Sequence, residues 1–464
     1  MKPIDDALLA DAVAYADEWL RYRQRTLRVP GIQVAIAHGD RVLLSRAYGV
    51  ADLAQGTPLT TEHRFRIASH SKMFTATALL LLQERGALAL DDRVGRWLDW
   101  LPAGEGELGR VTLRQLVSHA AGVIRDGVDN GFWQLERPFP DEARFRSLLE
   151  RASVVYAPNV RFKYSNFGFT LLGLVVERVS GVPYNTFVRE QVVEALGLAG
   201  TGPEPEDEVW DLLARGHSDQ NYGRDRVVLP HADTHAMSAA TGFYATAEDL
   251  CRFGRAHFLG NRALLSDESK REMQHEQWHI EGEERGYGLG MVTYEIGGRR
   301  LVGHTGGFPG FITSTMFDTE HQLVVTVLTN ASDGPASDLS AGVVRLVNRA
   351  QQATPATSGS APLSRFTGRF FGYGREVDVA RFGGELVAID PEGVNPLEPK
   401  TTLAVLGQDS LRIIEAPGFA SPGEEVRYEF AAGGEASAIW WAGGRLLPEA
   451  AFEAQRASRF PATR

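Results

Sequence analysis

The chain has 464 residues, more than one ordinary domain holds, so two domains are the natural expectation. Its formal net charge of −11 argues against the basic surface of a nucleic-acid-binding protein, and we predict no nucleic-acid partner. No stretch reaches the roughly 18 apolar residues that span a bilayer, so we expect no membrane partner and a cytoplasmic protein.

The cysteine and histidine content limits which disulfides and metal sites the chain can form. A single cysteine, Cys251, excludes an internal disulfide. It falls in a predicted helix, Thr246–Phe258, and is expected to be a packed core thiol, because nothing near it in the sequence would activate a nucleophile. The twelve histidines are scattered and form no HExxH pattern. We therefore predict neither a metal nor another cofactor.

The N-terminal part of the chain combines helices with a hairpin. Residues Asp5–Arg23 have helical periodicity and many charges, which is typical of an amphipathic surface helix and not of a signal peptide. Alternating residues on both sides of Gly39-Asp40 predict a two-stranded hairpin over Gly31–Leu53. The stretch from Ser69 to about Glu84 is apolar on nearly every face and predicts a buried helix. Three further helices are predicted at Val111–Val123, Pro140–Ala152 and Asn166–Gly181.

Strands return after residue 285. The pattern predicts three sequential antiparallel strands with turns at Gly297-Gly298 and Asp318–His321, and then a helix at Ser337–Ala350. Strands at both ends with helices between them predict one antiparallel sheet flanked by helices, with a helical subdomain, in the mixed α/β (α+β) class.

A change in composition marks the C-terminal part. Residues 351–364 are small and polar, as in a linker, and short alternating segments follow at strand-and-turn spacing. We therefore predict one large mixed α/β domain at 1–350, a linker at 351–364 and a small all-β barrel at 365–464. Sequence reasoning finds no catalytic constellation in the barrel.

The strongest chemical motif opens the predicted buried helix. Ser69 and Lys72 are three residues apart, so the hydroxyl and the amine lie on one helical face. Unpaired N–H groups at a helix start favour a developing oxyanion, and burial lowers the pKa of a lysine so that its amine can act as a base. Only five of the 48 basic residues are lysine, which makes Lys72 unusual. The alternative is a capping serine beside a lysine that reaches solvent.

Two other motifs are weaker when taken alone. Tyr164-Ser165-Asn166 precedes an apolar helix, where a phenol can relay a proton and an amide can hold a lysine, but the segment could equally be a helix cap. His304-Thr305-Gly306-Gly307 lies among the returning strands. Its glycines would let another backbone approach, as an oxyanion hole requires, or they could form a turn beside a hydrogen-bonded histidine.

The three motifs in this order resemble the serine β-lactamase and penicillin-binding protein superfamily. The resemblance is closest to the branch of class C β-lactamases, D-aminopeptidases (S12-type peptidases) and carboxylesterases, and it covers about residues 10–350. The segment after residue 365 resembles the lipocalin-like barrel appended to D-aminopeptidases. In such relatives the barrel borders the active site or mediates assembly, which implies a limit on substrate size or a homo-oligomer. The alternative is a passive stabilising domain.

The resemblance implies a role for each matching residue. Ser69 would be the acylated nucleophile, Lys72 and Tyr164 would share proton transfer, and Asn166 would orient the substrate and Lys72. The N–H groups of Ser69 and Gly307 would form the oxyanion hole. Thr305 and Gly306, in the same motif as Gly307, would contribute to substrate binding. His304 would bind or polarise the substrate.

The third motif departs from the family pattern. β-Lactamases and carboxypeptidases of the superfamily usually have lysine where His304 stands, and that lysine holds the substrate carboxylate. A histidine there is mostly neutral at pH 7, which weakens the case for β-lactam hydrolysis.

The resemblance implies a metal-free serine hydrolase of small amides or short peptides, D-aminopeptidase- or carboxypeptidase-like, with a small molecule or short peptide as its substrate. A carboxylesterase, a transacylase and a non-catalytic penicillin- or peptide-binding protein stay open as alternatives.

Overall fold

The chain was analysed as a computed structural model that describes residues 5–102, 104, 107–151, 154–220, 225–356, 363–417 and 421–460. It divides into two compact units. The larger one spans Arg28–Ser340, and the other combines the N-terminal helix with everything from Ala341 onward. No helix within the described ranges is both long enough and apolar enough to cross a membrane.

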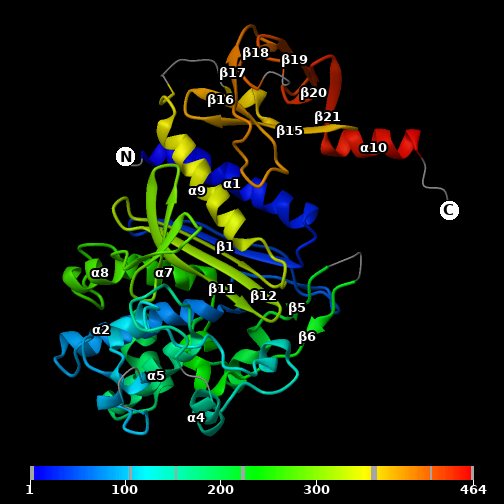
Figure 1. Ribbon diagram of the computed structural model, residues 1–464. Coiled ribbons are helices and arrows are strands. Elements are labelled where there is room, and N and C mark those ends of the chain that lie inside the picture. The colour runs from blue at the N-terminus through cyan, green and yellow to red at the C-terminus, as the bar shows by residue number, and fades with distance from the viewer. Residues whose placement is uncertain are drawn as a thin grey trace. The chain divides into compact units, whose positions relative to one another are not determined.

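An antiparallel sheet is the centre of the larger unit. Its nine described strands follow the order β3-β2-β1-β13-β12-β11-β10-β9-β8. The N-terminal strand β1 pairs with both β2 and β13, which confirms the predicted sheet with strands from both ends of the domain (Figure 1). The strands are β1 Gly31–His38, β2 Arg41–Asp52, β3 Thr57–Pro58, β8 Trp278–His279, β9 Arg285–Tyr287, β10 Val292–Ile296, β11 Arg299–Phe308, β12 Phe311–Asp318 and β13 Leu323–Thr329.

The returning strands differ from the prediction in one respect. The predicted turns at 297–298 and 318–321 are present, but the chain also reverses at Pro309-Gly310, so β11 and β12 are two strands where one was expected. Gly310 has φ +87°, in the left-handed region that glycine tolerates. A turn was the alternative left open for the glycines of the His304–Gly307 motif. Those glycines lie in β11, and Pro309-Gly310 forms the turn after them.

Helices cover the sheet and build the helical subdomain. In Figure 1, α2 and α5 lie together on one side of the sheet. The helices of the chain are α1 Asp6–Thr26, α2 Ser71–Glu84, α3 Leu113–Val117, α4 Glu142–Arg151, α5 Asn166–Ser180, α6 Tyr184–Val188, α7 Ala247–Ala256, α8 Asp267–Gln274, α9 Ala336–Gln352 and α10 Glu449–Arg459. Two short antiparallel strand pairs, β4 Phe65–Arg66 with β7 Tyr244–Ala245 and β5 Gly216–His217 with β6 Val228–Leu229, also lie in the larger unit.

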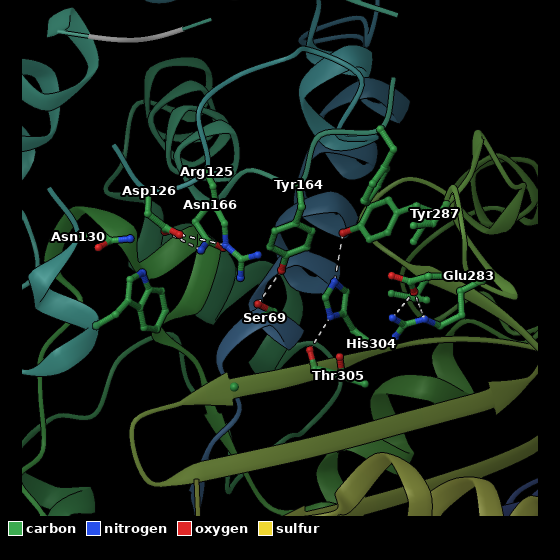
Figure 2. Close-up of a pocket in the computed structure, with 16 residues that line it drawn as sticks. Ser69, Arg125, Asp126, Asn130, Tyr164, Asn166, Glu283, Tyr287, His304 and Thr305 are labelled. Carbon is green, nitrogen blue, oxygen red and sulfur yellow. Dashed lines mark hydrogen bonds and ion pairs between the residues drawn. The ribbon is translucent and has the colours of Figure 1, made fainter. Parts of the chain in front are cut away.

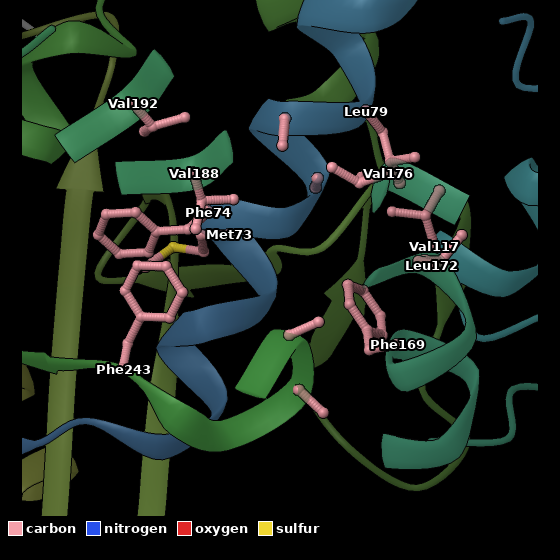
Figure 3. Close-up of a cluster of buried hydrophobic side chains, with 14 of the residues drawn as sticks. Met73, Phe74, Leu79, Val117, Phe169, Leu172, Val176, Val188, Val192 and Phe243 are labelled. Atoms are coloured by element: carbon pink, nitrogen blue, oxygen red, sulfur yellow. The ribbon is translucent and has the colours of Figure 1, made fainter. Parts of the chain in front are cut away.

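Helix α2 is the core of the larger unit, as its sequence predicts. Twelve of its fourteen residues are buried, and Figure 3 shows apolar side chains around it. Phe74 stacks on Phe243 and Phe253, with ring centres 4.4 and 4.1 Å apart. Cys251 is a buried thiol in α7, as expected, and burial raises its pKa to about 12. A helix packed on all sides gives Ser69 and Lys72 a rigid support.

The helix predicted at Val111–Val123 is much shorter than expected. It begins at a capping box between Thr112 and Gln115 and ends after Val117. His119 then adopts φ +59°, which no α-helix can include. The periodicity of the following residues therefore describes a loop, and that loop leads into the candidate site.

The second unit joins α1 to a closed barrel of eight described strands. The strands are β14 Gly368–Gly372, β15 Arg375–Phe382, β16 Glu385–Ile389, β17 Thr401–Val405, β18 Ser410–Glu415, β19 Glu425–Phe430, β20 Ala436–Trp441 and β21 Gly444–Pro448. This confirms the predicted barrel. Part of the predicted linker, residues 357–362, lies outside the described residues.

Buried polar contacts fix α1 to the barrel. The hydroxyl of Tyr15 donates to Asp378 at 2.6 Å, and the indole of Trp19 donates to the Pro391 carbonyl at 3.1 Å. Asp378 also receives two hydrogen bonds from Arg369, each 2.6 Å long. The predicted domain bounds, 1–350, 351–364 and 365–464, stay a prediction.

Candidate active site

The predicted motifs meet at one pocket of the larger unit, with a volume of about 590 Å³ (Figure 2). Its lining includes every predicted site residue except Lys72, which lies beneath it, and Gly306. The lining residues are Ser69, Arg125, Asp126, Asn130, Trp133, Phe162, Tyr164, Asn166, Ile280, Glu283, Arg285, Tyr287, Val292, His304, Thr305 and Gly307.

Ser69 occupies a strained turn between a strand and a helix. The preceding residue, Ala68, has φ +46°, a left-handed conformation that costs a non-glycine residue about 1–2 kcal/mol. Ser69 lies in the 3₁₀ turn Ala68–His70, immediately before α2. The buried helix α2 holds this strained turn in place, and the turn presents the Ser69 hydroxyl to the pocket.

Lys72 is fully buried and has three hydrogen-bonding partners. Its Nζ lies 3.1 Å from Ser69 Oγ, 2.7 Å from Asn166 Oδ1 and 2.8 Å from the Ala240 carbonyl. Burial lowers the pKa of Lys72 well below 10.5, so the neutral amine is accessible. The amide and carbonyl oxygens can only accept, so they take the two hydrogens of a neutral amine. Its lone pair then faces the Ser69 hydroxyl.

A second buried lysine shows what a structural lysine looks like in this chain. Lys270 Nζ donates to the carbonyls of Phe258 and Asn261 and to Asp267. All three partners can only accept, so this amine donates a hydrogen bond to each of them. Lys72 differs because one of its partners is a hydroxyl.

Asp126 fixes the orientation of Asn166. The Nδ2 group of Asn166 donates to Asp126 Oδ1 at 2.7 Å, and a carboxylate can only accept. The other end of the amide must therefore present its oxygen to Lys72. Asp126 also raises the pKa of Lys72 by its charge, against the larger effect of burial.

Tyr164 contacts the opposite side of Ser69. Its hydroxyl donates to Ser69 Oγ at 2.7 Å. Burial raises the pKa of Tyr164, so the phenol is protonated near neutral pH. Ser69 Oγ can thus accept from Tyr164 while its own proton points at the Lys72 lone pair.

His304 is held by the protein through both ring nitrogens. Nδ1 lies 2.6 Å from the Thr305 carbonyl, which can only accept, so Nδ1 carries the proton. Nε2 then accepts from the Tyr287 hydroxyl, 3.2 Å away. Burial lowers the pKa of His304 well below 6.5, and the charge of Lys72 lowers it further. The ring is a neutral part of the wall.

The glycines of the third motif have different surroundings. A Cβ on Gly306 would lie 2.1 Å from the Ile67 carbonyl, so only glycine lets β11 approach the turn that carries Ser69. A Cβ on Gly307 would make only an ordinary van der Waals contact, 3.6 Å from Ile312 Cδ1, and Gly307 lines the pocket. The motif therefore places a strand edge beside Ser69, as an oxyanion hole requires.

His119 holds the loop that carries Tyr164 from both sides. Its carbonyl accepts from the Lys163 N–H at 2.8 Å, and its Nδ1 accepts from the Ser165 N–H at 3.2 Å. Its ring lies against Tyr164, with ring centres 4.3 Å apart. His119 is therefore a positioning residue for the phenol.

We expect His119→Gly to lower kcat/KM by about tenfold to a hundredfold, because a displacement of about 1 Å at a reacting group has effects of that size. His119→Asn should recover much of the loss. Gly and Asn both tolerate the left-handed backbone at residue 119, but only Asn keeps an acceptor near the position of His119 Nδ1. Steady-state kinetics and thermal melting of both variants test this. Equal losses in the two would contradict a positioning role.

Several lining residues were missed from the sequence. Arg125, Asp126, Asn130 and Trp133 come from a segment in which the sequence showed no recognisable motif, and Tyr287 comes from β9, which lies between β10 and β8. The run Arg125-Asp126, a charged pair directly after the apolar segment 120–124, is the signal that could have found two of them. Among the described residues, no group of three His, Cys, Asp or Glu side chains could hold a metal.

Comparison with known proteins finds relatives among hydrolases and penicillin-binding proteins. Esterase EstB from Burkholderia gladioli is 30% identical over 329 residues, covering 62% of this chain and 80% of that protein. The D-aminopeptidase from Brucella anthropi is 28% identical over 322 residues, covering 67% of this chain and 58% of its own length. The octameric penicillin-binding protein homologue from Pyrococcus abyssi has a TM-score of 0.66 at 23% identity, covering 94% of this chain and 99% of that one.

The family model described as beta-lactamase matches residues 16–349, well over half of the chain. The relatives named above are an esterase and a D-aminopeptidase, which agrees with the serine hydrolase class. The chain therefore belongs to the beta-lactamase family.

Proposed function

We propose that the protein hydrolyses small amides or short peptides through an acyl-Ser69 intermediate. The observation that supports this most is the set of contacts around Ser69 Oγ, with Lys72 Nζ at 3.1 Å and Tyr164 OH at 2.7 Å. A neutral amine whose other two partners only accept is a base directed at one hydroxyl. D-Aminopeptidase- and carboxypeptidase-like substrates remain the preferred classes.

In the acylation step, Ser69 Oγ attacks the carbonyl carbon and its proton passes to Lys72 Nζ. The N–H groups of Ser69 and Gly307 bind the oxyanion. The tetrahedral intermediate breaks its bond to the leaving nitrogen or oxygen, which takes a proton from the Tyr164 phenol. The Lys72 ammonium then returns a proton to the Tyr164 phenolate. Lys72 Nζ lies 4.8 Å from the centre of the Tyr164 ring.

In the deacylation step, a water molecule attacks the acyl carbon, and the Tyr164 hydroxyl accepts the water proton while it passes its own proton to the neutral amine of Lys72. The bond between the acyl carbon and Ser69 Oγ breaks, and Ser69 recovers a proton from the same pair. Asn166 holds Lys72 throughout, and Asp126 holds Asn166. His304 acts here as a neutral wall residue beside Thr305 and not as a charged anchor.

A carboxylesterase is the second candidate, because the 30% identical relative is an esterase. The same residues would act on an ester in the same steps. Transfer of the acyl group to an amine or alcohol would need only an acceptor other than water. Assembly into a homo-oligomer is also a proposal, supported by the octameric relative of the same fold.

The test compares initial rates on D-alanine p-nitroanilide and p-nitrophenyl butyrate. Cleavage of the anilide supports the amidase and peptidase proposal. Cleavage of the ester alone moves the chain to the esterase candidate. Stoichiometric labelling of Ser69 without turnover of either substrate would instead identify a non-catalytic binding protein.

A further inference from the structure

The pocket contains charged groups that the proposed mechanism does not use. Glu283 and Arg285 form an ion pair, in which Glu283 Oε2 accepts from both Nε and Nη2 of the guanidinium. Asp126 is buried and accepts from Asn166 and from Arg125. Arg285 therefore has two of its nitrogens bound to Glu283, whereas neither Nη group of Arg125 has a hydrogen-bonding partner among the described residues.

Arg125 is held in place by its inner edge only. Its Nε donates to Asp126 Oδ2 at 3.1 Å, and its guanidinium carbon lies 5.1 Å from the centre of the Tyr164 ring. The side chain is 62% exposed, and its two Nη groups have no hydrogen-bonding partner among the described residues. Figure 2 shows Arg125 beside Asn166 and Tyr164, next to Ser69.

A second donor in the same pocket is also unused. The indole Nε1 of Trp133 is buried and has no partner among the described residues. A buried N–H without an acceptor costs free energy, and a ligand with acceptor oxygens would relieve that cost. The pocket thus offers donors from Arg125 and Trp133, and its two lining carboxylates, those of Asp126 and Glu283, are each paired with an arginine.

We propose that this pocket selects substrates that carry a carboxylate, bound by the Nη groups of Arg125. The two Nη groups form the planar fork that a carboxylate fits, and the Asp126 contact and the Tyr164 ring orient that fork before binding. The inference rests on the proposed function, since it names the substrate class of the same site. The carboxylate can belong to the acyl part or to the leaving group, and these two cases are separable.

The acyl part is tested with phenylboronic acid and its 3- and 4-carboxy derivatives, which bind a nucleophilic serine as tetrahedral adducts. The leaving group is tested with 4-carboxyphenyl butyrate and its methyl ester. In one of the two arms, we expect the carboxylate to improve Ki or kcat/KM by about tenfold or more relative to the neutral partner. The arm that responds identifies the part of the substrate that carries the charge.

The controls use ratios within each variant, so that general effects on the site cancel. The carboxylate preference is the ratio of kcat/KM, or of 1/Ki, for the carboxylate compound to that for its neutral partner. Arg125→Gln should bring this ratio close to one, and Arg125→Lys should give an intermediate value. Arg285→Gln removes a cation of the same pocket that is already paired, and it should keep the preference. A preference absent from both arms in the wild type, or retained in Arg125→Gln, would overturn the proposal. Failure of the neutral ester and of phenylboronic acid together would instead overturn the proposed function.

Discussion

The Ser69→Ala variant is expected to lose at least about 10⁴-fold in kcat on whichever substrate the wild type cleaves. Removal of a catalytic nucleophile has effects of this size, because the oxyanion hole and substrate binding alone supply only a small residual rate. The fold should persist, since Ser69 lies at the pocket surface and α2 keeps its buried contacts. Initial rates and thermal melting of the variant measure both effects.

Trapping of the acyl-enzyme provides the second readout for Ser69. Wild-type protein quenched in acid during turnover should show a mass increase equal to the acyl group, and Ser69→Ala should show none. Serine residues elsewhere, such as Ser71 in the same segment, remain as internal controls. Retained activity, or an adduct on another residue, would refute the assignment of the nucleophile.

Lys72→Met is the substitution with the second largest expected effect. Met fills a similar volume without a basic nitrogen, so general-base assistance is lost, which is typically worth about 10²–10⁴-fold. The matched control is Lys270→Met, which removes another fully buried amine remote from Ser69. Lys270→Met should lower thermal stability while keeping kcat per folded molecule. Equal catalytic losses in the two variants would mean that Lys72 has only a structural role.

The pH dependence of kcat/KM tests whether Lys72 acts as a base. A base must be neutral, so kcat/KM should rise with pH through the pKa of Lys72 and reach its plateau well below pH 10.5. Burial is the main cause of the low pKa, whereas Asp126 raises it. Asp126→Asn should therefore move the acidic limb to lower pH. A limb that does not move, or that moves upward, would contradict this electrostatic account.

The sequence by itself was sufficient for the fold class and for the order of the motifs. The apolar faces of α2 and the alternation along β2 and β19 are local periodicities that match the burial of these elements. Strand β1 differs, because it is buried on both faces. The spacing of Ser69 and Lys72 within one turn is likewise a local property. These predictions needed no knowledge of distant contacts.

Tertiary structure alone decided the charges and orientations of the pocket. Asp126 contacts Asn166, and Tyr287 contacts His304, across loops and strands that are far apart in sequence. The lowered pKa of Lys72 depends on burial by segments from the whole domain. The second unit likewise joins α1 to strands that begin after residue 367. Sequence determined which groups are available, and folding determined which of them meet, because desolvation and hydrogen bonding depend on neighbours in space.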